Sequence, residues 1–175
     1  MNRQEAETAS GDNPFWDYSV SLYGRDGIKD ACLTLQDEAG ADVNLLLFFC
    51  WSAQCGQGRL TRAQIQSAMA MVAVWRVQVL LPLRRVRRHL GRGGPPGAER
   101  LREDLLKLEL DAERIEQNHL FSGLAQETAT LKRTADMRRS DARYNCDIYF
   151  DELGMSLGAP LQEALDTLTV AATRD

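Results

Sequence analysis

One stretch constrains the fold more than any other: Asp42 and Asn44 precede seven consecutive apolar residues, Leu45 to Trp51. The run is far shorter than the roughly 20 residues that an α-helix needs to cross a bilayer. A short helix that is apolar on every side has to be enclosed by other helices. The run therefore predicts a buried central helix over about residues 42–55, with a polar residue at its start and Gly56 after its end.

Length and composition fit one globular domain. The chain has 175 residues, of which 44% are apolar and 26% charged, with a net charge of −4. These values are close to those of folded proteins, and the negative charge argues against a general attraction to nucleic acid or anionic membranes. The polar segment 1–12 has no apolar signal-peptide core, so we expect a disordered tail there, a single helical domain over 13–170 and a cytoplasmic location.

The middle of the chain predicts a long antiparallel helical hairpin. Thr61 and Gln64 form a capping box at the start of a helix over about 61–90, in which Pro82 should produce a kink. The glycine- and proline-rich segment 91–97 cannot continue a helix and predicts a flexible loop. A second helix should then run over about 98–120.

The second helix of the predicted hairpin carries an apolar seam with heptad spacing. Its positions alternate steps of four and three residues: Leu101, Leu105, Leu108, Ala112, Ile115 and His119. Such a seam packs along a straight partner helix. The partner is either the other helix of the hairpin, a second copy of the chain or an unknown protein.

The C-terminal part is less strongly patterned. Residues 126–143 are polar and predict marginal helix or loop, whereas Tyr144, Ile148 and Phe150 predict a short docking segment. Leu161, Leu165 and Leu168 predict a small amphipathic helix. No alternating strand pattern and no internal repeat occurs, so the expected fold class is all-α, a compact helical bundle.

An ordered string of short motifs runs along the first two thirds of the chain: Phe15-Trp16-Asp17-Tyr18-Ser19, Ala31-Cys32-Leu33, Gly40-x-Asp42-Val43-Asn44, Trp75-Arg76 and Leu81-Pro82-Leu83-Arg84. Over roughly residues 14–120 the chain resembles an uncharacterised proteobacterial family, domain of unknown function 2390. The family usually has proline before the glycine of the Gly27 turn, where this chain has Asp26. The resemblance implies a helical fold and no established activity.

The first candidate site lies at the start of the central helix. Asp42 and Asn44 are residue types that cap helices, which is their simplest role. Arg76 interrupts an apolar stripe beside Trp75, and a buried arginine needs an anionic partner. The alternative is therefore a polar ligand pocket formed by Asp42, Asn44, Trp75 and Arg76.

The second candidate is a positive cluster after Pro82, made of Arg84, Arg85, Arg87, Arg88 and Arg92. It suits an anion or an acidic partner surface, although the acidic helix that follows can neutralise it internally. No zinc spacing, catalytic triad or phosphate loop is present, and the four cysteines are expected to be buried thiols. We predict no metal, no cofactor and no catalytic residue.

These observations favour a non-catalytic protein-interaction or regulatory module. A small-ligand-binding protein or enzyme with a pocket at the central helix is the alternative. Nucleic-acid binding through the arginine cluster is the weaker alternative, because the chain has no recognised nucleic-acid-binding motif.

Overall fold

A computed structural model describes residues 13–91, 94–124 and 132–174, and these residues form helices without any strand. The predicted all-α class is therefore confirmed. The elements in chain order are α2 (Pro14–Tyr23), α3 (Ile28–Ala39), α4 (Val43–Gln54), α5 (Arg62–Trp75), the π-helix η1 (Arg76–Leu80), α6 (Leu81–Gly91), α7 (Glu99–Leu124), α8 (Ala135–Glu152) and α9 (Ala159–Ala172). The predicted tail at 1–12 lies outside the described residues.

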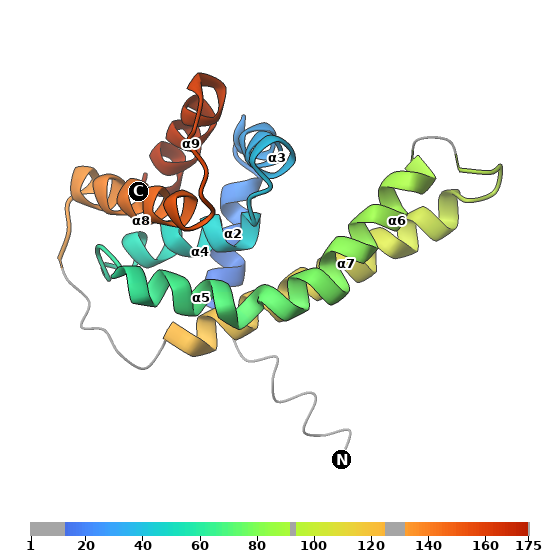
Figure 1. Cartoon of the computed structure of the whole chain (residues 1–175), viewed down its shortest axis with the longest axis horizontal. Helices are drawn as coiled ribbons and strands as arrows, with labels where there is room; N and C mark the ends of the chain where they lie inside the picture. Colours follow the sequence, from blue (N-terminus) through green and yellow to red (C-terminus); the bar gives the residue numbers. More distant parts are fainter. Residues whose placement is uncertain (1–12, 92–93, 125–131, 175) are drawn as a thin grey trace, which may run out of the picture.

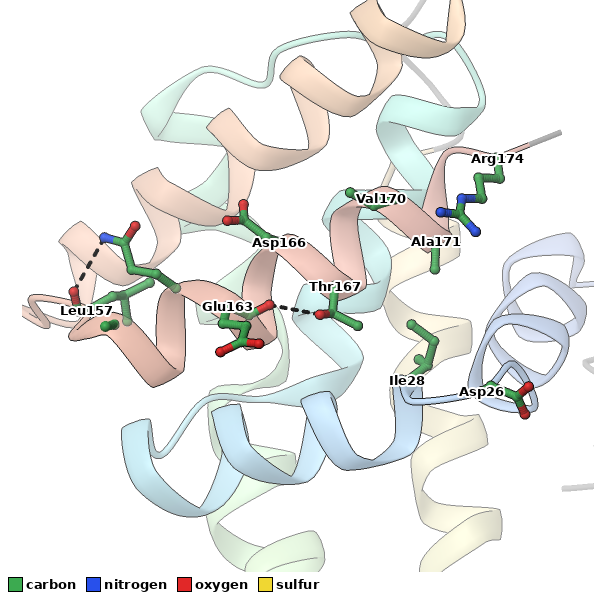
Figure 2. Close-up of a pocket in the computed structure, with 11 residues that line it drawn as sticks. Asp26, Ile28, Leu157, Glu163, Asp166, Thr167, Val170, Ala171 and Arg174 are labelled. Atoms are coloured by element: carbon green, nitrogen blue, oxygen red, sulfur yellow. Dashed lines mark hydrogen bonds between the residues drawn. The ribbon is translucent and has the colours of Figure 1, made fainter.

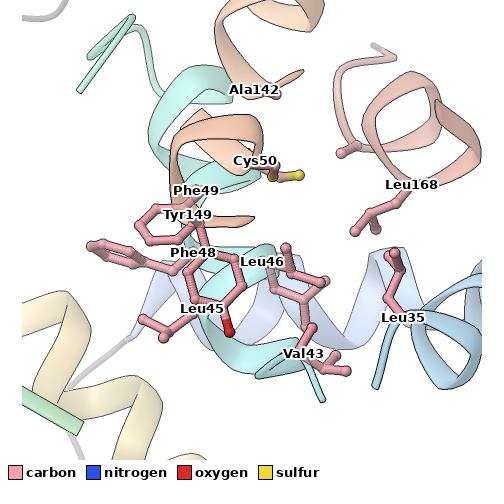
Figure 3. Close-up of a cluster of buried hydrophobic side chains, with 14 of the residues drawn as sticks. Leu35, Val43, Leu45, Leu46, Phe48, Phe49, Cys50, Ala142, Tyr149 and Leu168 are labelled. Carbon is pink, nitrogen blue, oxygen red and sulfur yellow. The ribbon is translucent and has the colours of Figure 1, made fainter. Parts of the chain in front are cut away.

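The central helix α4 is enclosed as the sequence predicts. Every residue from Val43 to Ala53 is buried, and α2, α3, α7, α8 and α9 all contact this helix (Figure 1). Aromatic rings connect it to its neighbours. The centroids of Phe49 and Tyr149 lie 5.6 Å apart (Figure 3), and those of Phe15 and Phe48 lie 5.5 Å apart. This cluster is the core of the domain.

The junction between α3 and α4 brings the polar groups to the core. Gly40 ends α3 with a φ of 63°, a left-handed conformation that glycine adopts without steric cost. The chain then reverses within two residues and Asp42 caps α4. Asp42 is therefore held at the point where the central helix begins.

The predicted hairpin is formed by the continuous helix α5–η1–α6 and by α7, and it projects from the body of the molecule (Figure 1). The expected kink at Pro82 takes a particular form. The helix widens to a π-turn just before this residue, and Leu81 N–H bonds to Arg76 O. A π-bulge accommodates the missing donor and the bulky ring without ending the helix.

The long helix Arg62–Gly91 is also the only one in the described ranges with the length and apolar composition of a membrane span. Core helices of soluble proteins share this length and composition but are mostly buried, whereas 22% of the apolar window of this helix is buried. Ile65, Ala68, Val72 and Leu80 of this helix are buried within the domain. The helix is thus built into the bundle along one of its faces.

Two expectations need correction. Residues 135–143 belong to α8, so the weakly structured segment predicted over 126–143 is wrong for that part; Thr134 caps the helix by accepting a hydrogen bond from Met137 N. The heptad seam on α7 does not pack as one stripe. Ala112 is buried and Leu105 half-buried, whereas Leu101, Leu108, Ile115 and His119 are exposed.

Candidate functional site

The first polar cluster surrounds the start of α4. Asp42 is almost fully buried, and one carboxylate oxygen accepts a hydrogen bond from Asn44 N at 3.0 Å. The backbone N–H of Asp42 donates to the hydroxyl oxygen of Tyr149 at 2.8 Å. Burial raises the pKa of the Tyr149 phenol, so this hydroxyl stays neutral. Asp42 therefore has the capping role that the sequence predicts.

Asp42 also meets Arg76. The guanidinium Nε lies 3.0 Å from the second carboxylate oxygen, and Arg76 Nη2 donates to the carbonyl of Gly40 at 2.7 Å. Both contacts hold the long hairpin helix against the α3–α4 junction. Trp75 points elsewhere: its indole N–H donates to Ala112 O at 3.0 Å and ties α5 to α7. Of the four residues predicted to line a pocket, Asp42 and Arg76 therefore meet, whereas Trp75 contacts α7.

Asn44 is bonded to α7 instead. Its side-chain amide donates to Glu116 at 2.5 Å, and its side-chain oxygen accepts from Gln117 at 2.8 Å. Glu116 is fully buried, and its other oxygen has no hydrogen-bond partner among the described residues. Burial, together with the negative charge of Asp42, raises the pKa of Glu116 to about 8. This carboxyl is therefore mostly protonated near neutral pH.

Sequence reasoning missed Glu116 and Gln117 because it considered the acids of α7 only as partners of the arginine cluster. A signal was present in their spacing. Glu109, Glu113 and Glu116 are separated by four and three residues, so they form their own stripe on the helix. That stripe faces inward.

The acidic stripe pairs with arginines of α6. Arg84 Nε lies 3.2 Å from Glu109 and Arg84 Nη2 lies 2.5 Å from Glu113, while Arg87 also pairs with Glu109. Arg84 and Glu109 are both buried. The predicted internal neutralisation of the arginine cluster is therefore found for two of its members.

The remaining members line a groove of about 740 Å³ between the C-terminal end of α3 and α6. Arg88 pairs there with Asp37 at 2.6 Å, while Arg85 and His89 form no ion pair with the described residues. The groove is lined by Gln36, Asp37, Gly40, Arg76, Leu81, Arg84, Arg85, Arg88 and His89. Asp42 and Asn44 are not part of this lining, and Arg92 lies outside the described residues.

A second groove, of about 870 Å³, lies between the start of α3 and α9 (Figure 2). Ile28 and Val170 supply apolar lining, and Asp26, Glu163 and Arg174 stand at its edges. Asp166 is engaged by Arg143 of α8. The polar groups do not converge on one point, so this groove carries no recognisable chemistry.

No group of three or more possible metal ligands occurs within the described ranges. Cys32, Cys50 and Cys146 are buried free thiols, and Cys55 is a half-buried one. Burial raises the pKa of the Cys32 thiol to about 12, which keeps it protonated and unreactive.

Comparison with known proteins gives one match. A family model described as "Protein of unknown function (DUF2390)" matches residues 14–120. This match confirms the resemblance given above for the same span of the sequence. No curated protein and no solved structure matches the chain.

Proposed function

The chain belongs to the DUF2390 family, and from its own geometry we propose that it is a non-catalytic protein-interaction module that uses the projecting hairpin as its contact surface. One observation carries the proposal. The hairpin buries ion pairs between α6 and α7, and it leaves many of its large apolar side chains exposed although Leu80 and Ala112 are buried. Exposed apolar surface that is bordered by polar residues commonly marks a protein-binding site.

The exposed apolar residues occupy both helices of the hairpin. On α5–η1–α6, Val74 is 74% exposed, and Val77 and Leu81 follow it at steps of three and four residues, so they lie near one another on the helix surface. On α7 the exposed apolar residues are Leu101, Leu106, Leu108, Leu110 and Ile115.

The buried polar network supports this role by fixing the hairpin to the body. Arg76 joins the long helix to Gly40 and Asp42, and Asn44 joins α4 to Glu116 of α7. A fixed helical pair loses less freedom on binding than a mobile one, which favours affinity. In this proposal the predicted site residues hold the contact surface in place and take no part in chemistry.

A matched pair of substitutions tests the proposal. Val77→Asp adds a charge to the exposed apolar stripe, and Gln78→Asp adds the same charge at the adjacent exposed position. We expect Val77→Asp to abolish the retention of proteins that full-length wild-type protein captures from native lysate, and Gln78→Asp to leave it intact, with equal thermal stability of both variants. If both variants retain the captured proteins equally, the stripe that contains Val77 is not the contact surface.

Anion binding in the groove between α3 and α6 is a second candidate function. The specific observation is that, among the described residues, Arg85 and His89 have no ion-pair partner there, and Arg88 pairs with the exposed Asp37 alone. A phosphate-bearing small molecule would replace the Asp37 carboxylate as the partner of Arg88, and Arg85 would bind the same phosphate. Titration calorimetry with pyrophosphate tests this: Arg85→Ala should weaken binding about tenfold, while Arg100→Ala, an exposed arginine of α7, should leave it unchanged.

Nucleic-acid binding through the arginine cluster has less support. Arg84 and Arg87 are occupied by Glu109 and Glu113, which leaves few free cations for a phosphate backbone. The net charge of −4 adds to this disadvantage. We also propose a cytoplasmic location, which fractionation of cells that produce the tagged full-length protein would test.

A further inference from the structure

The outer flank of α7 is apolar at a spacing of seven residues. Leu101, Leu108 and Ile115 are 55%, 54% and 41% exposed. On an α-helix, residues seven apart drift by only about 20° per step, so the three side chains form a nearly straight line along the helix. No described part of the chain covers this line.

Charged residues run beside the apolar line in an alternating order. The exposed Arg100 begins this row, and the exposed Asp104, Lys107, Asp111 and Arg114 follow it as acid, base, acid, base. Read in the opposite direction along the helix, the same order is base, acid, base, acid. The flank is therefore complementary to itself when two copies run antiparallel.

We propose that a second copy of this chain docks on this flank, with the two α7 helices antiparallel about a two-fold axis next to Leu108 and Glu109. Asp104 and Arg114 each lie five residues from Glu109, so they face each other across the pair. Lys107 and Asp111 each lie two residues from Glu109, so Lys107 of one copy faces Asp111 of the other. Leu101 of one copy then meets Ile115 of the other, and the two Leu108 side chains meet near the axis.

A parallel, in-register pair would place each charge opposite its own copy and is disfavoured by repulsion. In the antiparallel pair, Asp104 of one copy and Asp111 of the other are offset by three residues along the helices, so these like charges do not face each other. Lys107 and Asp104 of one chain lie 3.2 Å apart, but both are exposed, so this pair is easily exchanged. Arg114 lies over the Trp16 ring at 5.4 Å, at the base of the hairpin.

The shape of the molecule allows this arrangement. The hairpin projects from the body, so the part of α7 near the hairpin tip lies away from the other helices of the body (Figure 1). The stripe around Val74 and Val77 on the other helix has no comparable row of alternating charges, since the neighbouring Arg76 pairs with Asp42. The inference rests on the proposed function and names a partner for the α7 part of the same surface.

Light scattering of full-length protein over a range of concentrations gives the first test. We expect a dimer in the wild type and a monomer for Leu108→Asp. Leu110→Asp is the matched control, because it places the same charge on an exposed position of the opposite flank of α7. A wild-type monomer at all concentrations, or a dimer lost with Leu110→Asp and kept with Leu108→Asp, would overturn the proposal.

A charge exchange tests the antiparallel register. Lys107→Asp and Asp111→Lys should each raise the dimer dissociation constant about tenfold, because each places like charges opposite one another twice per dimer. The two substitutions together in one chain restore opposite charges and should return the constant to within about threefold of wild type. A double variant that is weaker than both single variants would overturn the register.

Cysteine crosslinking distinguishes the two directions independently. Leu101→Cys chains should not crosslink to one another, because two residues at this position lie about 21 Å apart along the antiparallel pair. A mixture of Leu101→Cys and Ile115→Cys chains should form disulfide-linked heterodimers. Crosslinking of Leu101→Cys alone indicates a parallel pair and overturns the proposal.

The outcome also separates this inference from the proposed function. If the wild type is monomeric but Val77→Asp still abolishes the capture of another protein, only the second copy is wrong. If the wild type is monomeric and captures nothing, both proposals fail.

Discussion

The domain body and the hairpin are built in opposite ways. Around α4, apolar side chains fill the interior, and the buried polar side chains of Asp42 and Asn44 lie at the start of the helix. In the hairpin, Arg84 and Glu109 fill the interior between α6 and α7, while Val74 and Leu108 face water. Because apolar burial is the main source of folding stability, the body should stabilise the fold and the hairpin surface should serve contacts.

The largest expected effect lies in the body. Phe49→Ala removes a fully buried ring from the centre of the core, and we expect the free energy of unfolding to fall by about 4 kcal/mol. Urea denaturation measures it. Val77→Ala, on the exposed stripe, is the matched control and should change stability by less than about 0.5 kcal/mol. Similar losses for the two variants would erase the contrast between body and hairpin.

The hairpin interior should respond to the loss of charge. Arg84→Ala leaves Glu113 without its arginine and Glu109 with Arg87 alone, so we expect a loss of about 3 kcal/mol. Arg85→Ala, the neighbouring exposed arginine, should cost less than about 0.5 kcal/mol by the same measurement. If Arg84→Ala is as mild as its control, the ion pairs do not hold the hairpin together.

The junction between the two regions should be sensitive to pH. The pKa of Glu116 is about 8 in the folded protein and near the ordinary value of about 4.3 in the unfolded chain. Between these values only the folded state holds the proton, so the free energy of unfolding should fall as pH rises from about 5 to 8.

Glu116→Gln keeps the shape of this side chain and removes its titration. We expect this variant to exceed the wild type in stability by about 2 kcal/mol at pH 9 and to match it near pH 5. Parallel urea titrations at the two pH values measure the difference. A wild type that gains stability toward pH 9 relative to the variant would contradict the assignment. The groups that face Glu116 are Asp42, Asn44, Arg76 and Arg84.

The smallest expected effect is on the exposed stripe. Val74→Ser should leave the free energy of unfolding within about 0.3 kcal/mol of wild type, because the side chain buries little surface. A loss above about 1 kcal/mol would show that Val74 contributes to the core of the fold.

The body could be predicted from the sequence because its signals are local and uniform. The run from Leu45 to Trp51 has no polar face, so only an enclosed helix fits it. The capping box at Thr61 and Gln64 marks the start of the long helix, and both of its hydrogen bonds are present. The meeting of Asp42 and Arg76 was one of two alternatives left open, since it depends on how two distant helices pack.

The orientation of α7 could not be predicted from its own sequence. The heptad seam favours turning Leu108 inward, but the facing helix α6 offers arginines there instead of an apolar stripe. Glu109 and Glu113 therefore turn inward to pair with Arg84, which rotates Leu101 and Leu108 to the outside. The first half of α8 was predicted only as marginal helix or loop because its polar sequence gives a weak periodic signal, although Thr134 is a good cap.

Light scattering on full-length protein, run beside an affinity capture from native lysate, tests the central claim most directly. We predict twice the mass of one chain for the wild type and the mass of a single chain for Leu108→Asp. The Leu108→Asp and Leu110→Asp variants should have equal thermal stability. A wild-type protein that stays monomeric at every concentration and retains no other protein would contradict the assignment of the hairpin as a contact surface.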